Sequence, residues 1–383
     1  MDKMNDLERF RSLHIAMLGH KRIPSREGGI EVVVEELSVR MVQKGHQVTC
    51  YNRRGHHVSG KEYDAAGLTE YKGVRLKSVF TIDKKGLAAM TASFFAAVRA
   101  AFGNYDIVHF HAEGSCAVLW LPKLFGRRCV VTVHGLDHRR AKWGKLARCY
   151  IMLGERCAAK YADKIIVLSR SVQRYFADTY GRETVYIPNG VNRPKRCPPQ
   201  LIRKEYQLEQ DSYILFLGRL VPEKGIRYLI EAFKRVKTDK KLVIAGGSSD
   251  TEKYKEELQK LAKGDDRILF TGFVQGQWLD ELFGNAYVYT LPSDLEGMPL
   301  SLLEAMSYGN CCLISDIDEC TEAVGKHAVR FRRSDTEDLR EKLQKLCDDP
   351  KLVETYRAEA ADFVCEKYNW DSVAEETLRI YKE

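Results

Sequence analysis

Short apolar runs alternate with segments of helical periodicity, and this alternation restricts the fold of the chain more than any other feature. In the first half the strand-like runs are residues 14–19, 46–52, 106–111, 129–134 and 164–169, with a helical pattern over 29–44. In the second half they are residues 213–220, 241–246, 267–273, 286–291 and 311–315. Strands that alternate with helices predict mostly parallel, doubly wound α/β sheets, in which ligands bind at the carboxyl ends of the strands.

A break in the pattern separates the two halves. Residues 188–199 contain four prolines and a glycine, which continue neither a helix nor a strand and so indicate a linker. At 383 residues the chain is long enough for two domains that each bury a core. We therefore predict one domain over residues 1–190, a second over 191–368, and a final amphipathic helix over 369–383.

The two halves differ in charge. Residues 1–190 contain 31 Lys and Arg against 18 Asp and Glu, a net charge of +13, whereas residues 191–383 have a net charge of −5. A basic half favours an anionic partner such as a membrane surface, a lipid phosphate or a nucleic acid. The alternative is an ordinary solvated surface.

Other features exclude several classes of protein. The first 13 residues are charged and lack the apolar core of a secretory signal, and the longest apolar run, residues 87–98, is too short to span a membrane. The eleven cysteines include no Cys-x-x-Cys pair, which fits a reducing cytoplasm better than a disulfide framework. The absence of a Gly-x-Gly-x-x-Gly fingerprint counts against a nicotinamide enzyme.

Residues 293–306 place two carboxylates around a predicted helix start. Pro299 suits the first turn of a helix that Gly309 ends, and the free N–H groups of that turn suit an anion such as a diphosphate. Glu304, on the helix, could accept hydrogen bonds from both hydroxyls of a ribose, while Glu296 could reach a group attached to the diphosphate. We expect the residues between the two glutamates to contact the same ligand: Gly297, Met298, Pro299, Leu300 and Ser301.

Two cations follow the first strand of the second half. Arg219 comes directly after Gly218, which we also assign to the donor site, and Lys224 follows five positions after Arg219. Charge grows on a departing diphosphate as its bond to carbon breaks, and two fixed cations could stabilise that charge as a metal ion does in other folds. We therefore expect no cofactor and no metal, and an activity that survives EDTA. The Asp316-Ile317-Asp318 sequence is interpreted as helix capping rather than as a metal motif.

The first half has candidate site residues at three strand ends. Gly28 and Gly29 open the first helix and allow close backbone approach to a phosphate. His111 and His134 each end or follow a strand, so both should open toward a ligand. A zinc site made of these two and His109 lacks the spacing of a helical metal motif, and we disfavour it.

These pieces, in this order, resemble a known enzyme family. Two glutamates eight positions apart around Gly-Met-Pro-Leu-Ser are similar to the E-x7-E signature of the retaining GT-B glycosyltransferases of family 4 (glycosyl transferases group 1). The resemblance implies two Rossmann-like domains facing across a cleft, with the last helix returning to the first domain. It implies a nucleotide-sugar donor held by the second domain and by Asn189. It also implies catalytic roles for His134, Arg219, Lys224 and Glu296.

A basic stretch follows His134. Arg139, Arg140, Lys142 and Lys145 surround Trp143, a combination typical of surfaces that bind anionic lipid headgroups or a lipid pyrophosphate. The alternative is a solvated face. With His111, we assign these residues to an acceptor or membrane surface.

The function expected from these observations is sugar transfer in cell-surface polysaccharide biosynthesis. The donor would be a UDP- or dTDP-sugar, the acceptor a polysaccharide or lipid-linked saccharide held by the basic half, and the location the cytoplasm or the inner face of the membrane. No nucleic acid partner is expected. The alternatives are a nucleotide-sugar epimerase of the same fold and a non-catalytic sugar or nucleic-acid binding protein. The base, the sugar, the linkage and the oligomeric state are left open.

Overall fold

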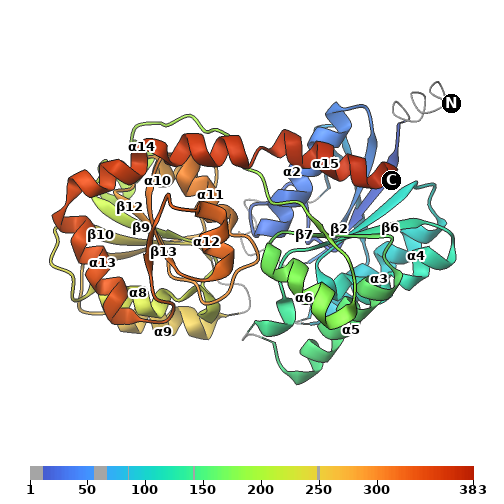
Figure 1. Cartoon of the computed structure of the whole chain (residues 1–383), viewed down its shortest axis with the longest axis horizontal. Helices are drawn as coiled ribbons and strands as arrows, with labels where there is room; N and C mark the ends of the chain where they lie inside the picture. The colour runs from blue at the N-terminus through green and yellow to red at the C-terminus, as the bar shows by residue number, and fades with distance from the viewer. Residues whose placement is uncertain (1–11, 56–66, 85, 141–142, 248–250) are drawn as a thin grey trace. The chain divides into compact units, whose positions relative to one another are not determined.

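The chain forms two compact units in a computed structural model that describes residues 12–55, 67–84, 86–140, 143–247 and 251–383 (Figure 1). Unit 1 contains the described residues up to Asn189 together with Trp370–Glu383. Unit 2 is Gly190–Asn369. The unit boundaries thus fall within one residue of the boundaries that the sequence suggested, after 190 and after 368.

Unit 1 is built on an eight-stranded sheet in the order β3-β4-β2-β1-β5-β6-β7-β8. Its strands are β1 (His14–Leu18), β2 (Gln47–Arg53), β3 (Glu70–Tyr71), β4 (Val74–Val79), β5 (Ile107–His111), β6 (Arg128–Val133), β7 (Lys164–Val167) and β8 (Val185–Tyr186). Its helices are α2 (Gly29–Gln43), α3 (Leu87–Phe102), η2 (Glu113–Val118), α4 (Trp120–Leu124), η3 (Asp137–Arg139), α5 (Lys145–Tyr161), α6 (Arg170–Tyr180) and α15 (Trp370–Lys382).

The strand order of unit 1 reverses between β1 and β5. Every pairing in the sheet is parallel except that of β3 with β4. From β1 the chain proceeds outward through β2 and β4, then returns to β5 and proceeds the other way. At such a switch point the loops after two central strands diverge, which is where doubly wound sheets bind ligands. The loops after Leu18 and His111 therefore mark the candidate site of this unit.

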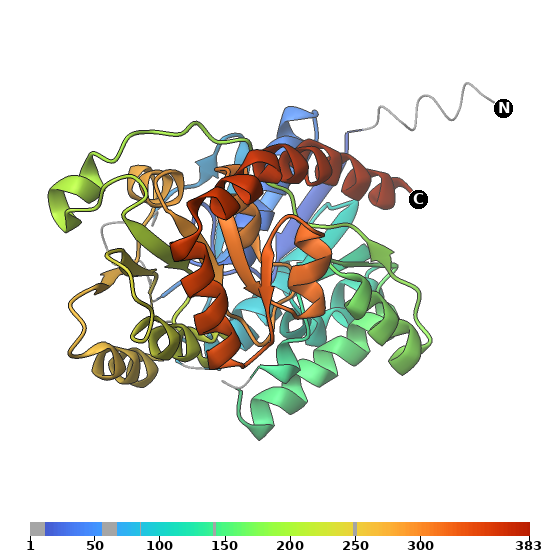
Figure 2. The ribbon, with the colours of Figure 1, turned by 60° about the vertical axis from the view of Figure 1, so that its left-hand side comes forward.

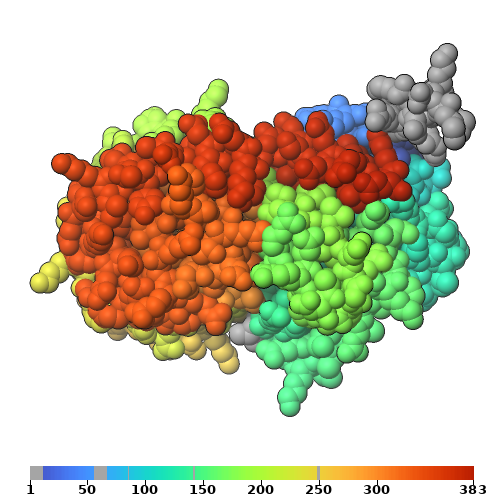
Figure 3. Space-filling model, viewed as in Figure 1, coloured from blue at the N-terminus to red at the C-terminus, as the bar shows by residue number. Residues whose placement is uncertain are grey.

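The C-terminal helix α15 completes unit 1. Figures 1 and 2 both show this dark red helix beside the blue α2, and Figure 3 shows it on the surface of the molecule. Ion pairs join the two helices, Arg40 to Asp371 at 2.7 Å and Lys44 to Glu375 at 2.6 Å. The Tyr381 hydroxyl lies 2.5 Å from Nδ1 of the buried His109 in β5. The last helix is thus part of the core of the unit that begins the chain.

Unit 2 is built on a six-stranded, fully parallel sheet in the order β11-β10-β9-β12-β13-β14. Its strands are β9 (Tyr213–Leu217), β10 (Lys241–Ala245), β11 (Ile268–Gly272), β12 (Val288–Leu291), β13 (Cys311–Ser315) and β14 (Val329–Phe331). Its helices are α7 (Leu201–Tyr206), η4 (Pro222–Lys224), α8 (Ile226–Phe233), α9 (Glu252–Ala262), α10 (Gln277–Gly284), α11 (Leu300–Ser307), α12 (Asp318–Val324), α13 (Thr336–Asp348) and α14 (Pro350–Lys367).

The four central strands of unit 2, β10, β9, β12 and β13, are almost fully buried, as a parallel sheet covered on both faces requires, whereas the edge strands β11 and β14 are partly exposed. Large aromatic side chains fill the space between sheet and helices: Tyr213, Phe216, Phe233, Phe283, Tyr289 and Phe331. The strand order reverses between the central β9 and β12. The loops after Leu217 and Leu291 thus mark the candidate site of unit 2.

Two local predictions need correction. Pro299 does not lie in the first helical turn but is the N-cap of α11, with an extended ψ of 100°. The prediction that Asp316 and Asp318 cap a helix is wrong, because the N-cap of α12 is Ile317 and no side chain caps it. Asp316 Oδ1 instead accepts a hydrogen bond from the backbone N–H of Arg333 at 2.8 Å. It therefore fixes the loop that follows β14.

Among the described helices, none is both long enough and apolar enough to cross a lipid bilayer.

Candidate functional site

In unit 2, the predicted cations and one predicted carboxylate meet at the switch point. The loop after β9 carries Arg219 and leads into η4, which ends at Lys224. The loop after β12 carries Glu296. Lys224 Nζ lies 2.6 Å from Glu296 Oε1, and the two side chains are only 12% and 8% exposed. The sequence placed both residues at one site but did not predict that they form an ion pair.

The Glu296 carboxylate is held in place by its own loop. Ser293 Oγ donates to Glu296 Oε1 at 2.6 Å, and Ser315 Oγ, from the end of β13, donates to the Ser293 carbonyl. A carboxylate fixed by a hydroxyl and an ammonium group is an oriented acceptor with its second oxygen still available. The same ion pair keeps the Lys224 ammonium close to the strand ends.

The second predicted carboxylate, Glu304, lies on α11, which starts directly after the loop. Gly297, Met298, Pro299 and Leu300 are buried under this helix start, whereas Ser301 and Glu304 remain partly exposed. Tyr289, from β12, donates its hydroxyl to Ser301 Oγ at 2.8 Å. Burial raises the pKa of Tyr289, and Glu296 and Glu304 raise it further, so both carboxylates lie near this one ring. The two halves of the predicted motif therefore both act on the same buried tyrosine.

Two glycines allow the loops of unit 2 to approach closely. Gly246, after β10, has φ +142°, and a Cβ there would lie 1.8 Å from the Gly218 carbonyl oxygen. Gly225 has φ +66°, and a Cβ there would lie 1.9 Å from the Pro292 oxygen. Only glycine permits both this backbone conformation and this contact. Neither position was singled out from the sequence for this purpose.

In unit 1, the loop after β1 packs against the end of β5. Gly19 has φ +100°, and a Cβ there would lie 2.0 Å from the His111 carbonyl oxygen. The next residue, His20, is 1% exposed, and its Nε2 lies 3.1 Å from Asn52 Oδ1. Burial lowers the pKa of His20 to about 4, so the imidazole is neutral near pH 7. The sequence did not single out His20, whose burial depends on the tertiary structure.

The glycine pair at the start of α2 has a carboxylate beside it. Gly28 is the N-cap and Gly29 the first residue of α2, as expected. Glu31 accepts from the Lys21 N–H at 2.8 Å, and its Oε2 would lie 2.6 Å from a Cβ on Gly28. Burial acts to raise the pKa of Glu31, but Lys21 and other cationic neighbours outweigh it and hold the pKa below its ordinary value. An ionised Glu31 makes this helix start less suited to a diphosphate than the glycines suggested.

The histidines after β5 and β6 form a pair. His111 Nδ1 lies 3.0 Å from His134 Nε2, so one ring donates to the other. Burial lowers the pKa of His134 to about 4, with Asp137 and Glu31 acting in the opposite direction. His111 is fully buried, which corrects its assignment to an acceptor or membrane surface. Its role is to orient His134, which is partly exposed.

Asn189, assigned to the donor site, is 3% exposed and is the last residue of this segment of unit 1.

Comparison with protein families identifies the chain. Residues 27–194 match the model of the family "Glycosyltransferase Family 4". Residues 199–363 match the model of the family "Glycosyl transferases group 1". The second match contains Arg219, Lys224, Glu296 and Glu304. The chain belongs to the group 1 glycosyltransferases.

Relatives of this glycosyltransferase extend over its full length. An uncharacterised glycosyltransferase of Methanocaldococcus jannaschii is 26% identical over 97% of this chain and 98% of the relative. The UDP-Gal:α-D-GlcNAc-diphosphoundecaprenol α-1,3-galactosyltransferase of Escherichia coli is 31% identical over 56% of this chain and 59% of that enzyme. The structure of Anabaena HepE in complex with UDP and glucose has a TM-score of 0.80 at 16% identity, over 96% of this chain and 99% of that one. The likeness shows that the transferase has the GT-B fold.

The basic stretch of the transferase is partly engaged in contacts within unit 1. Arg140 pairs with Asp137 at 2.7 Å, and the Arg139 guanidinium lies over the Tyr175 ring, 5.1 Å from its centroid. Trp143 is half-buried, Lys145 is exposed, and Lys142 lies outside the described residues. The two arginines therefore stabilise the loop that follows His134 through contacts within unit 1.

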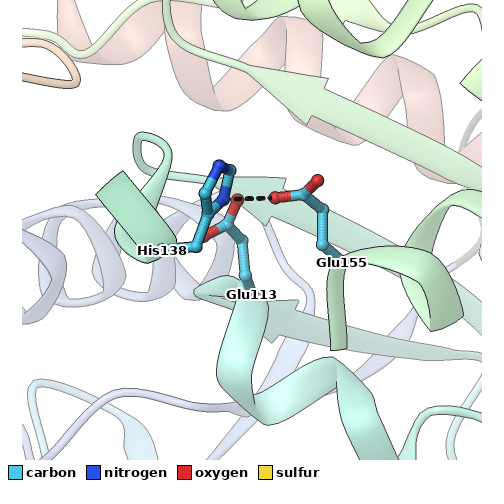
Figure 4. Close-up of side chains that lie close together, drawn as sticks. All are labelled: Glu113, His138 and Glu155. Carbon is cyan, nitrogen blue, oxygen red and sulfur yellow. Dashed lines mark hydrogen bonds and ion pairs between the residues drawn. The ribbon is translucent and has the colours of Figure 1, made fainter. Parts of the chain in front are cut away.

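A buried set of three polar side chains supports the same loop in the glycosyltransferase (Figure 4). Glu113 of η2, His138 of η3 and Glu155 of α5 bring one ligand atom each within 4.8 Å of one another, a set of groups that could hold a metal ion. His138 Nδ1 lies 3.0 Å from Glu155 Oε2, and Glu155 Oε1 accepts from Tyr175 and Tyr180. The sequence pointed only to the strand-end histidines and to Asp316 and Asp318 as possible metal ligands, and did not indicate this set.

Protonation of Glu113, the third member of the set, explains how this side chain can be buried beside two other carboxylates without a metal ion. Glu113 Oε2 accepts from the Asp137 N–H at 2.7 Å, but no donor among the described residues reaches its buried Oε1. Burial raises the pKa of Glu113 well above its ordinary value of 4.5, and the nearby Asp137 and Glu155 carboxylates raise it further. A protonated Glu113 can donate to Glu155 and leaves no uncompensated charge in the interior.

We expect Glu113→Gln to preserve the fold and Glu113→Ala to lower the free energy of unfolding by about 1–3 kcal/mol, because only alanine leaves the Asp137 N–H without its acceptor. A raised pKa in the folded state stabilises the wild type below pH 4.5, and this contribution is lost as pH rises through the folded pKa. The melting temperature of the wild type relative to Glu113→Gln should therefore fall as pH rises above 4.5. A difference that rises with pH would contradict the raised pKa.

Proposed function

We propose that this glycosyltransferase moves a sugar from a UDP- or dTDP-sugar to a polysaccharide or lipid-linked saccharide, with retention of anomeric configuration, in cell-surface polysaccharide synthesis at the inner face of the membrane. Unit 2 binds the donor and unit 1 the acceptor. The name of the Escherichia coli relative specifies a UDP-sugar and a diphosphoundecaprenol-linked acceptor, and this supports the choice. So does the UDP found with glucose in the Anabaena structure.

The observation that carries the proposal is the meeting of cations and carboxylates at the switch point of unit 2. Lys224 and Glu296 are 2.6 Å apart at the ends of adjacent central strands, Arg219 lies in the same loop as Gly218, and α11 starts four residues after Glu296. Cations near a helix N-terminus suit a diphosphate. Glu304, further along α11, suits a ribose diol.

The chemistry follows from these positions. The bond between the anomeric carbon and the diphosphate oxygen breaks, and negative charge grows on the diphosphate, where Arg219, Lys224 and the N–H groups of α11 stabilise it. The acceptor hydroxyl attacks the same face of the sugar and gives its proton to the leaving diphosphate. Glu296 keeps Lys224 in place and orients the transferred sugar through its second oxygen. These residues supply the positive charge, so the donor site needs no metal.

Glu304→Gln is expected to weaken UDP binding about tenfold to hundredfold, because an amide cannot accept hydrogen bonds from both ribose hydroxyls, and bonds to a charged group contribute about 1.5–3 kcal/mol. Isothermal calorimetry with UDP measures this directly. Glu296→Gln provides the comparison, since it should reduce turnover more than UDP affinity. EDTA should not change the UDP affinity of the wild type. Unchanged affinity in Glu304→Gln would remove the ribose role.

Release of UDP separates the proposed transfer from its alternatives. A transferase releases UDP only when an acceptor is present, whereas an epimerase of the same fold interconverts the donor without one, and a sugar-binding protein does neither. Incubation of each candidate nucleotide sugar with and without an acceptor extract, followed by quantification of UDP, dTDP and GDP, distinguishes the three. UDP or dTDP release that requires the extract is the expected result.

A further inference from the structure

Helix α3 of unit 1 carries its large apolar side chains on the outside. Its buried face consists of small residues: Ala92, Ser93, Ala96, Ala97, Ala100 and Ala101. Its exposed face includes Leu87, Met90, Phe94, Phe95 and Phe102, and Phe102 is 70% exposed. A helix on a protein surface normally has the opposite arrangement, with its large apolar residues in the core. The outer face of α3 therefore has the composition of a buried surface.

The exposed apolar face continues beyond α3. The Phe102 ring lies 4.6 Å from that of Phe125, which follows α4, and the Phe80 ring, after β4, lies 5.2 Å from that of Phe95. Trp120 and Leu124 of α4, the helix that packs beside α3 (Figure 1), are 42% and 73% exposed. We call this surface the α3–α4 face. Its members are Phe80, Leu87, Met90, Phe94, Phe95, Phe102, Trp120, Leu124 and Phe125.

The exposed large hydrophobic residues are confined to one part of the chain. Within the parts of the chain that the structure describes, every exposed large hydrophobic residue lies between Leu68 and Tyr161, and none lies in unit 2. Scattered single apolar residues are ordinary on a protein surface, but a contiguous patch marks an interaction site. The α3–α4 face thus requires an occupant.

The charge of the same segments identifies the occupant. Residues 84–105 and 114–136 contain Lys and Arg but no Asp or Glu, within a half of the chain whose net charge is +13. Aromatic and aliphatic side chains among cations match an interface of anionic headgroups over acyl chains, with Lys123 of α4 already paired to Asp163 at 2.8 Å. A protein partner would be expected to face a polar rim of both signs.

We propose that the α3–α4 face is the surface through which this protein binds an anionic lipid bilayer, with Phe94, Phe95, Phe102 and Leu124 entering the headgroup region. This surface is distinct from the basic stretch after His134, two of whose arginines are held by Asp137 and Tyr175. The proposal rests on the membrane location in the proposed function and assigns that contact to a surface, and it can be tested separately because bilayer binding by these side chains requires neither a donor nor an acceptor.

The test is sedimentation of the full chain with vesicles of phosphatidylcholine that contain phosphatidylglycerol, without nucleotide. Leu124→Gln and Leu146→Gln form a matched pair, since both leucines are exposed, at 73% and 89%, and only Leu124 belongs to the α3–α4 face. We expect Leu124→Gln to weaken partitioning about tenfold and the triple variant Phe94→Gln, Phe102→Gln, Leu124→Gln to abolish it. Leu146→Gln should partition like the wild type.

Each other outcome contradicts the proposal. If the triple variant binds vesicles as well as the wild type, the membrane contact lies elsewhere. If only Leu146→Gln loses binding, the contact lies on the basic stretch. Sedimentation velocity without lipid that shows a dimer for the wild type and a monomer for the triple variant would make the face a contact between two copies. UDP calorimetry on the triple variant should give the wild-type affinity. Absence of UDP binding by the wild type would contradict the donor site of unit 2 and would leave the bilayer proposal unaffected. The two proposals are therefore tested separately.

Discussion

We expect Lys224→Ala to lower kcat about 100-fold or more, because removal of one preorganised contact to a developing anion typically has an effect of this size. Lys224 is the cation whose position the structure fixes best, at 2.6 Å from Glu296 at the end of the two central strands of unit 2. Arg219→Ala, in the same loop, should have a comparable effect. Steady-state turnover with saturating donor and acceptor measures both.

Two controls make the Lys224 experiment specific. Lys260→Ala removes an exposed lysine from α9 of the same unit and should leave kcat unchanged. Lys224→Ala combined with Glu296→Gln should lose less than the product of the single effects, because residues in direct contact couple. A fall of less than about threefold in Lys224→Ala, with the protein folded, would show that the diphosphate is stabilised by other groups.

We expect Gly246→Ala to lower the free energy of unfolding of unit 2 by more than about 3 kcal/mol, the range in which point substitutions have an identifiable structural cause. The added Cβ would lie 1.8 Å from the Gly218 carbonyl oxygen at a φ of +142°. Backbone must therefore move, and the loop that moves carries Arg219. UDP affinity should fall together with the melting temperature.

Gly264→Ala is the matched control for that substitution. Gly264 also has a positive φ, +90°, but a Cβ there meets nothing within 4 Å. Alanine at Gly264 should therefore lower the free energy of unfolding by about 1–2 kcal/mol, the strain of the backbone conformation alone. Equal losses in the two variants would mean that the contact between Gly246 and Gly218 relaxes without moving the site.

The sequence predicted the alternation of strands and helices because the strands of a parallel sheet buried on both faces are near-continuous apolar runs, which stand out in the sequence. β13 has the bounds expected, and most other strands end one to three residues early, where the chain turns into a loop. The short edge strands β3, β8 and β14 were not predicted, since two or three residues carry no periodic signal. The six-residue β4 was not predicted either.

Within the sites, the sequence predicted which strand ends carry functional groups but not how those groups pair. The contact of Lys224 with Glu296 joins residues 72 positions apart, and its existence depends on β9 and β12 being neighbours. The burial of His111 depends on the loop after β1 covering the end of β5. Glu31 and Glu113 gave no signal as isolated glutamates, because their role follows from burial that only the tertiary structure creates.

Unit 1 is completed by residues that are synthesised after residues 190–369 of unit 2. Helix α15 supplies Trp370, Val373, Leu378 and Tyr381 to its buried surface, and the whole of unit 2 lies between Asn189 and Trp370 in the chain. During synthesis, unit 2 can therefore finish folding while the β5 histidine, His109, still lacks the Tyr381 hydroxyl that lies 2.5 Å from it in the finished protein. Domains generally fold as units in the order in which they emerge. Here the domain that starts the chain finishes after the one that follows it, and until then its unfinished face is exposed to chaperones and proteases.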